Sequence, residues 1–281
     1  MFAAAFDYHR PETVDEAIRL MREVEGARVL AGGHSLLPAM KLRLAAPAAL
    51  IDIGRIAQLK GITDSLRIGA LTTHAEIAAS EVLRAKCPVL ASTASHIGDL
   101  QVRNRGTIGG SVAHADPGAD YPTVLLLLDA TFHASNGGSR DIAAREFFVD
   151  LFTTSLQPGE LLTGVTVPST DGASAVYLKH RHPASSFAVV GVGALLRMAN
   201  GRVAEARVSI GGATAAPVRA KAAEDALVGQ EPNDAAIAEA AAAVAGSLPD
   251  PIGDAYASGE YRVHLATVMT RRALTQLAAG G

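Results

Sequence analysis

The chain has 281 residues, of which 49% are hydrophobic, and its formal net charge at pH 7 is −3. This composition predicts a globular protein with one large core or roughly two to three smaller ones, and the interspersed charges argue against a nucleic-acid partner. Because the apolar runs are too short to span a bilayer and the first residues lack the pattern of a secretory signal, we expect a cytoplasmic protein without a membrane span.

The first predicted elements form a small α/β lobe, which we place at residues 1–58. Residues 13–16 read Thr-Val-Asp-Glu, the pattern of a capping box, and apolar residues at helical spacing follow, so we predict a helix over residues 14–25. Short strands are predicted at residues 28–31 and 50–53, and a pair of glycines directly follows the first of them. Helix, strand, glycine turn and strand in this order are typical of an α/β arrangement.

A second lobe is predicted at residues 59–170. Residues 65–70 have the composition of a strand, and Thr-His-Ala-Glu at residues 73–76 repeats the capping-box pattern. A proline then begins a predicted helix over residues 88–97. Residues 160–168 are strand-like up to their final proline, which ends the lobe.

The third predicted part, residues 173–281, has strands first and helices afterwards. Strand candidates lie near residues 175–180, 187–198 and 202–211, and alanine-rich sequence follows, most densely at residues 234–248. The high helix propensity of alanine favours a packed helix there over a low-complexity linker. Strands followed by helices indicate a separate α+β domain.

Cys87 is the only cysteine. One thiol cannot form an internal disulfide, and a cysteine-ligated iron–sulfur cluster needs about four thiolates, so any such cluster must lie on another chain. We assign Cys87 no role beyond that of a small buried hydrophobe. His180 and His182 alternate on a predicted strand without a third ligand nearby, which favours exposed strand residues over a metal site. No Gly-x-Ser-x-Gly elbow is present, so hydrolase chemistry has no support.

Two glycine-rich loops are the strongest candidates for ligand binding. A dinucleotide's diphosphate needs backbone amides without side chains in the way, and Gly32-Gly33 and Gly109-Gly110 meet that need. Neither pair fits the G-x-G-x-x-G pattern or a P-loop, so a Rossmann or P-loop mechanism is not supported. A single Gly-Gly pair is more often a plain turn. Here there are two pairs, and Ser35 and Ser111 follow them closely. A plain turn and a phosphate-binding loop are therefore about equally favoured.

Four other polar residues accompany these loops. His34 and His114 are candidate donors to a phosphate, although His34 would equally suit a cap on its own turn. Asp116 and Asp120 have the spacing of a general acid–base pair, but the Pro-Gly between them indicates a loop. We therefore favour ribose binding over proton chemistry for this pair.

Several motifs, taken in order, resemble the flavoprotein subunits of the xanthine dehydrogenase family, and most closely the medium-subunit type of aerobic carbon monoxide dehydrogenase. The likeness covers nearly the whole chain, and its segments are residues 6–11, 31–38, 50–53, 97–110, 116–122, 212, 216–219 and 261–265. It implies an α+β fold: a two-lobed FAD-binding domain of the vanillyl-alcohol-oxidase/murein-reductase type, followed by a small C-terminal α+β domain of the carbon monoxide dehydrogenase flavoprotein type.

The resemblance, with the loop residues above, also implies which positions contact FAD. Residues 31–36 would wrap the diphosphate, the second glycine loop would face it, Asp120 would bind a ribose hydroxyl, and Lys179 would lie near the flavin ring. The full set of predicted contacts is Ala31, Gly32, Gly33, His34, Ser35, Leu36, Ile97, Thr107, Gly109, Gly110, Ser111, His114, Asp120, Leu162 and Lys179. Ser111 stands where asparagine is common in the family, and Phe187 where some relatives have tyrosine. These departures bear on the tuning of the flavin, not on FAD binding itself.

The function implied is electron transfer in a molybdenum hydroxylase. A large molybdopterin subunit would oxidise the substrate, a small 2Fe-2S subunit would relay electrons, and FAD on this chain would pass them to a terminal acceptor. A dimer of such heterotrimers is expected. The alternatives are a self-sufficient FAD-dependent oxidoreductase and a flavin-free scaffold that retains the fold. The sequence indicates neither the substrate nor the acceptor, because substrate selectivity would lie in the molybdenum subunit.

Overall fold

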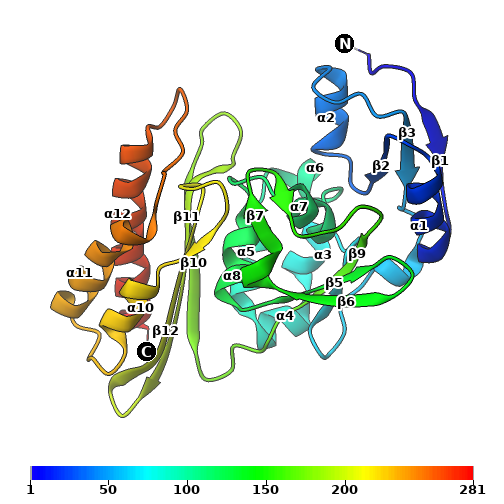
Figure 1. The fold of residues 1–281 in the computed structure, drawn as a ribbon. Helices are drawn as coiled ribbons and strands as arrows, with labels where there is room; N and C mark the ends of the chain where they lie inside the picture. The colour runs from blue at the N-terminus through cyan, green and yellow to red at the C-terminus, as the bar shows by residue number, and fades with distance from the viewer. Residues whose placement is uncertain (1, 281) are drawn as a thin grey trace.

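The computed structural model describes residues 2–280 as three parts that follow one another along the chain and lie in a row (Figure 1). The first part is a three-stranded parallel sheet in the order β1-β3-β2 with two helices. Its elements are β1 (Asp7–His9), α1 (Val14–Glu23), β2 (Ala27–Leu30), α2 (Leu36–Lys41) and β3 (Ala49–Asp52). The predicted helix and both predicted strands are present, with their bounds within two residues of those expected.

Helix α1 begins at the predicted cap. The Thr13 side chain accepts a hydrogen bond from the Glu16 backbone N–H at 3.2 Å. The reciprocal bond of a capping box differs from expectation, because the Glu16 carboxylate accepts from the Glu12 N–H, at 3.1 Å, and not from that of Thr13. The helix buries Ala17 and Ile18, which belong to the core cluster that also contains sheet residues of this lobe.

The second part contains a four-stranded antiparallel sheet in the order β4-β9-β5-β6, a small hairpin and several short helices. The predicted N-termini of two helices are confirmed: Thr73 forms a capping box with Glu76, and Pro88 begins a helix. The elements are η1 (Ala57–Leu59), β4 (Arg67–Gly69), α3 (His74–Ala79), α4 (Glu81–Lys86), α5 (Pro88–Ser95), α6 (Leu100–Arg103), α7 (Ile108–His114), α8 (Asp120–Leu127), β5 (Thr131–Ser135), β6 (Ser139–Ala143), α9 (Ala144–Phe147), β7 (Phe148–Asp150), β8 (Thr153–Thr154) and β9 (Leu161–Thr166).

Helix α8 is the central helix of the molecule, and all of its residues are buried. It packs against α5 of its own part and against β11 and β12 of the third part, so a mostly apolar sequence suits both faces. Asp120 begins α8, whereas Asp116 lies in the preceding loop, where its carboxylate accepts a hydrogen bond from Gly118 N at 2.9 Å. The loop expected from the Pro-Gly pair is therefore present.

The third part is a four-stranded antiparallel sheet, in the order β10-β11-β12-β13, followed by helices. Figure 1 shows this sheet edge-on, with helices α10 to α12 on one side and the second part on the other. The three long predicted strands and the alanine-rich helix are confirmed. The elements are β10 (Ser174–Arg181), β11 (Ala188–Ala199), β12 (Arg202–Gly211), β13 (Val218–Arg219), α10 (Lys221–Leu227), α11 (Asp234–Ala243), η2 (Val244–Ser247) and α12 (Gly259–Ala279).

A group of ion pairs joins the second part to the third. The Asp129 carboxylate lies 3.1 Å from an Arg207 nitrogen and 3.2 Å from an Arg219 nitrogen, and both arginines belong to the third part. Arg145 approaches the same carboxylate at 3.3 Å from its own part. Three arginines around one acid form a network, which stabilises more than an isolated surface pair does. Between residues 2 and 280, no helix combines the length and the apolar character needed to cross a bilayer.

Candidate cofactor site

The first glycine loop connects the end of β2 to the start of α2. Gly33 has a φ of 79°, in the left-handed region that glycine adopts without strain. The backbone N–H groups of Gly32, Gly33, His34 and Ser35 donate to no acceptor within the part of the chain that the structure describes. A row of free amides in a loop before a helix is the arrangement that binds a diphosphate.

The second glycine loop begins α7, and its two glycines differ in their surroundings. Gly109 is buried, its N–H donates to Ala70 O at 2.9 Å, and a Cβ added to it would lie 2.5 Å from Ala70 Cβ. Gly110 is exposed, and its N–H donates to the Thr107 hydroxyl oxygen at 3.1 Å. This bond leaves the Thr107 hydroxyl hydrogen free to donate. Gly109 thus packs the loop against its own lobe, whereas Gly110 faces outwards.

The two loops, one from each lobe, meet. A Cβ added to Gly32 would lie 2.8 Å from the Arg105 carbonyl carbon and 2.9 Å from Gly106 Cα, so the first loop rests on the backbone just before the second. A Cβ added to Gly110 would lie 3.7 Å from the Cβ of Ala31. The structure therefore brings the predicted residues of both loops to one junction, with glycine at the points of closest approach.

The side chains predicted as donors at this junction have few contacts of their own. His34 is exposed, and its Nδ1 lies 3.4 Å from Gly32 O, a weak contact within its own turn. Ser35 precedes α2 without capping it, and Leu36 is the first residue of that helix. Ser111 is half-buried on the first turns of α7.

His114 lies at the other end of α7, away from the second glycine pair. Its ring centroid is 5.1 Å from that of Phe152, a half-exposed residue on the turn between β7 and β8. No side-chain hydrogen bond or aromatic pair within residues 2–280 joins His114 to the first loop. Its role as a phosphate donor stays a prediction.

A second cluster lies where the second and third parts meet. Lys179 Nζ on β10 lies 3.0 Å from the Asp120 carboxylate and donates to His96 O at 3.1 Å. Tyr177, two residues earlier on the same strand face, donates its hydroxyl hydrogen to Asp120 Oδ1 at 2.7 Å. Burial raises the pKa of Asp120, and the charge of Lys179 and the hydrogen bond from Tyr177 act against that rise. The predicted residues Asp120, Lys179 and Ile97, which follows His96, therefore lie close together.

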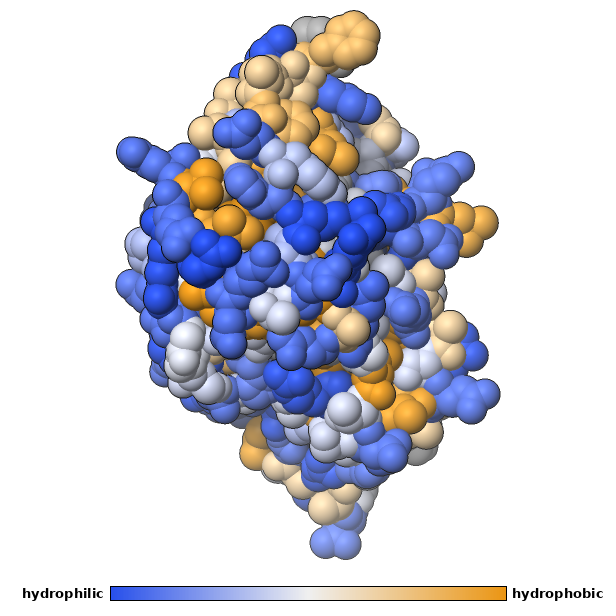
Figure 2. Space-filling view, turned by 90° about the vertical axis from the view of Figure 1, so that its right-hand side faces the viewer, coloured by the Kyte–Doolittle hydropathy of each residue, from blue (hydrophilic) through white to orange (hydrophobic). Residues whose placement is uncertain are grey.

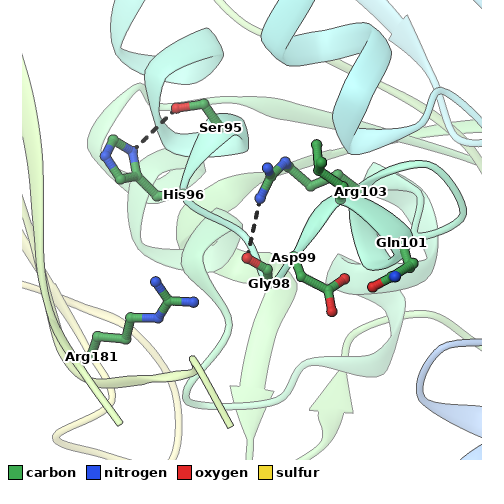
Figure 3. Close-up of a pocket in the computed structure, with 8 residues that line it drawn as sticks. Ser95, His96, Gly98, Asp99, Gln101, Arg103 and Arg181 are labelled. Atoms are coloured by element: carbon green, nitrogen blue, oxygen red, sulfur yellow. Dashed lines mark hydrogen bonds between the residues drawn. The ribbon is translucent and has the colours of Figure 1, made fainter. Parts of the chain in front are cut away.

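A cavity of about 540 Å³ opens beside this cluster (Figure 3). Figure 3 shows Arg181 extending from the end of β10 towards the loop of His96 and Gly98. Arg103 holds that loop by donating to Ile97 O at 3.0 Å and to Gly98 O at 3.1 Å. The cavity is lined by Ser95, His96, Gly98, Asp99, Leu100, Gln101, Arg103 and Arg181. Its lining carries the basic side chains of Arg103 and Arg181 and the acidic side chain of Asp99.

Two further residues of the prediction lie near this region. Leu162 is buried on β9, in the same core cluster against which Ile97 packs. Phe187, in the loop between β10 and β11, is 44% exposed. A Cβ added to Gly118 would lie 3.3 Å from the Phe187 ring, so this ring covers the loop before α8.

Sequence reasoning missed a buried pair directly behind the glycine junction. His74, on α3, is 4% exposed, and its Nδ1 lies 3.2 Å from the hydroxyl of the fully buried Tyr121. A Cβ added to Gly106 would lie 2.5 Å from His74 Nε2, so the imidazole fills the space beside that glycine. Burial lowers the pKa of His74 to about 4, and His34 and Arg103 add to the effect. The ring is therefore neutral at pH 7.

With this geometry established, comparison with known proteins identifies the family. Residues 4–170 match the model of the FAD binding domain in molybdopterin dehydrogenase, and residues 175–277 match that of the CO dehydrogenase flavoprotein C-terminal domain. The chain belongs to this flavoprotein family of molybdopterin dehydrogenases. The family's FAD cofactor, its oxidoreductase character and the predicted α+β fold are thereby confirmed.

Individual relatives agree with this assignment over their full length. The chain is 35% identical to the glyceraldehyde dehydrogenase medium chain of Sulfolobus acidocaldarius, and the match covers 99% of this chain and 100% of the relative. It is 36% identical to the carbon monoxide dehydrogenase medium chain of Afipia carboxidovorans, with 99% of each covered. A solved structure of carbon monoxide dehydrogenase from Hydrogenophaga pseudoflava is similar with a TM-score of 0.95 and 37% identity over 99% of both chains.

Quinoline 2-oxidoreductase from Pseudomonas putida 86 is similar to the same degree in structure, with a TM-score of 0.95 and 33% identity over 100% of this chain and 99% of that one. Flavoproteins of this family thus occur in enzymes named for quite different substrates. The residue-by-residue FAD contacts and the boundaries between the lobes stay predictions.

Proposed function

We propose that this chain is the FAD-binding subunit of a multi-subunit molybdenum hydroxylase, and that it passes electrons from iron–sulfur clusters of a partner subunit to a terminal acceptor. The observation that supports it best is the junction of the two glycine loops, where free amides and a hydroxyl converge from separate lobes. When bound there, FAD supplies the redox chemistry, while the protein binds and orients it.

The first loop would hold the diphosphate. Its four free N–H groups lie on consecutive residues, Gly32 to Ser35, and can donate to phosphate oxygens without displacing any hydrogen bond of the chain. From the other lobe, Thr107 can donate its hydroxyl hydrogen, and Gly110 leaves the approach open. A ligand held from both sides would fix the lobes relative to each other.

The Asp120 cluster would orient the other end of the cofactor. A carboxylate accepts roughly four hydrogen bonds, and Tyr177 and Lys179 account for only part of that capacity. A ribose hydroxyl can therefore still donate to Asp120. The Lys179 side chain is 7% exposed and would keep a positive charge near the flavin ring. Because little water reaches this charge, it would attract the negative charge of a reduced flavin more strongly than an exposed lysine does.

The electron supply must come from outside the chain. Cys87 is fully buried, and burial raises the pKa of its thiol to about 11, so it offers no thiolate for a cluster. We propose a small 2Fe-2S subunit and a large molybdopterin subunit as partners, assembled as a dimer of heterotrimers. The relatives named medium chains support such an assembly. A cytoplasmic location stays part of this proposal.

Exposed apolar side chains are consistent with an assembly. In Figure 2 hydrophobic side chains gather at the upper end of the view, over the N-terminal segment and α2. Phe2 is 91% exposed, and Leu42 and Leu44, just after α2, are 58% and 79% exposed. Clustered apolar residues at a surface typically mark an interaction site.

Purification of the chain alone tests the proposal. We expect one FAD per chain in its spectrum, and no oxidation of candidate donors with an artificial acceptor unless the partner subunits are added. A chain that binds no FAD would be a scaffold. Turnover without partners would identify a self-sufficient oxidoreductase, and either result would contradict the proposal.

A further inference from the structure

Strand β10 forms an open edge of the C-terminal sheet. Within residues 2–280 it pairs only with β11, and the residues of β10 are mostly half-buried, whereas β11 is buried continuously from residue 188 to 196. The opposite edge, β13, is only two residues long. An eight-residue strand leaves every second N–H and C=O unpaired along an edge of about 26 Å.

Proteins commonly guard such an edge with a lysine or a bulge. Lys179 does not guard this one, because its side chain turns inwards to Asp120. The bulge lies at the end of the strand, between His180 and Arg181. The edge therefore stays available for pairing over most of its length.

A groove of about 570 Å³ runs between this edge and α12. Its lining includes Leu178, Lys179 and His180, three consecutive residues. The lining contains three consecutive β10 residues and no residue of the neighbouring strand β11, so the groove lies along the outer edge of β10. The groove thus exposes the unpaired backbone of β10.

Helix α12 forms the other wall with one continuous face. The spacing of its lining residues follows the helical repeat, and the middle of the face is apolar. These residues are Tyr261, His264, Leu265, Val268, Met269 and Arg272. A groove between an edge strand and a helix, with an apolar floor, is the setting in which peptides bind by strand addition.

The charge of the groove selects the kind of segment that fits. The Arg272 side chain brings a positive charge to the groove, and the rings of His180 and His264 offer N–H donors; none of these three side chains forms a hydrogen bond or ion pair within residues 2–280. No acidic residue lines the groove, and β10 itself contains none. A second copy of β10 therefore offers no complementary charge, whereas an acidic segment does.

We propose that an extended segment carrying aspartate or glutamate, supplied by a partner subunit, pairs with β10 and lies in this groove. The pairing satisfies the edge N–H and C=O groups, and the acidic side chains meet Arg272 and the ring N–H groups of His180 and His264. The inference rests on the proposed function, because the segment comes from a subunit of the same complex.

Hydrogen exchange followed by mass spectrometry, on the isolated chain and on the assembled complex, tests the pairing. Peptides covering β10 should exchange about tenfold more slowly in the complex, because their outward N–H groups become hydrogen-bonded. Peptides covering β13, the opposite edge of the same sheet, should not change. A complex that forms with unchanged exchange over β10 would overturn the inference and leave the proposed function standing.

Charge reversal on α12 tests the acidic character of the segment. Arg272→Glu should weaken assembly about tenfold, because it places a negative charge in the groove. Arg271→Glu is the matched control: Arg271 is the neighbouring exposed residue, does not line the groove, and should change assembly by less than about twofold. Equal effects of the two variants would show that the groove is not the contact.

Two other outcomes would also be decisive. If β10 becomes protected in the isolated chain as its concentration rises, a second copy occupies the edge, and the inference is wrong. If the chain forms no complex with molybdopterin and iron–sulfur subunits at all, the inference and the proposed function both fail.

Discussion

Gly32→Ala should weaken FAD binding by disturbing the contact between the lobes, not by filling the cofactor's space. The new Cβ would overlap the Arg105 carbonyl oxygen, its nearest neighbour, and would lie 2.8 Å from the carbonyl carbon. Ordinary contacts begin near 3.4 Å, so the two backbones must separate by more than about 0.6 Å. Overpacking of this kind costs about 1–3 kcal/mol. If that cost falls on the closed, FAD-bound state, the dissociation constant should rise about 5- to 150-fold.

Titration of the apo chain with FAD, followed by quenching of flavin fluorescence, measures this effect. Gly246→Ala is the matched control, because a Cβ there meets nothing within 4 Å and the residue has no left-handed φ. The control should bind FAD as the unchanged chain does. Wild-type affinity in Gly32→Ala would refute the reasoning that the two glycine loops must meet to hold the cofactor.

Three further predictions follow from the same region. Gly33→Val should abolish FAD binding in a soluble chain, because valine is strained at a φ of 79° beside Leu37; a full complement of FAD in this variant would show that the loop is misassigned. Asp120→Ala should lose more FAD than Asp116→Ala and about 3–5 kcal/mol of stability, because it leaves the buried Lys179 unpaired; equal losses would contradict the ribose assignment. The pKa of His74 is about 4 in the folded chain and 6.5 in the unfolded chain. The free energy of unfolding is therefore unaffected by this group above about pH 6.5. It decreases by about 3 kcal/mol as the pH falls from 6.5 through 4, because the unfolded chain binds the proton more tightly. Urea unfolding at pH 7.5 and 4.5 should show a larger loss in the unchanged chain than in a His74→Gln variant, and equal losses would exclude this linkage.

The elements that the sequence predicted well are those whose pattern is local. The cap at Thr13 and the stripe behind it predict α1, and strand-like segments separated by turn residues predict the long strands β10 to β12. The two glycine pairs located both loops, and the resemblance to the family then implied FAD as their ligand. The separate roles of Gly109 and Gly110 were not predictable, because Gly109 meets Ala70 only when its own lobe is folded, and Gly110 meets Ala31 only when the two lobes are packed together.

Residues that act across the lobes were harder to find. Tyr177 had a signal that was not used: two residues before Lys179 on a strand, it must share that residue's face and so reach Asp120. His74 had no such signal, since its partner Tyr121 is 47 residues away and only the fold brings them together. The register between distant elements is set by packing, which a single sequence does not display.

The central claim is that this chain receives its electrons from a partner's clusters and carries them on FAD. Anaerobic mixing of the native complex, and of the isolated FAD-loaded chain, with the complex's own donor tests it most directly through the flavin absorbance. We predict that the flavin bleaches in the complex and stays oxidised in the isolated chain. Bleaching of the flavin in the isolated chain, or an unchanged flavin in a complex that turns over, would contradict this account.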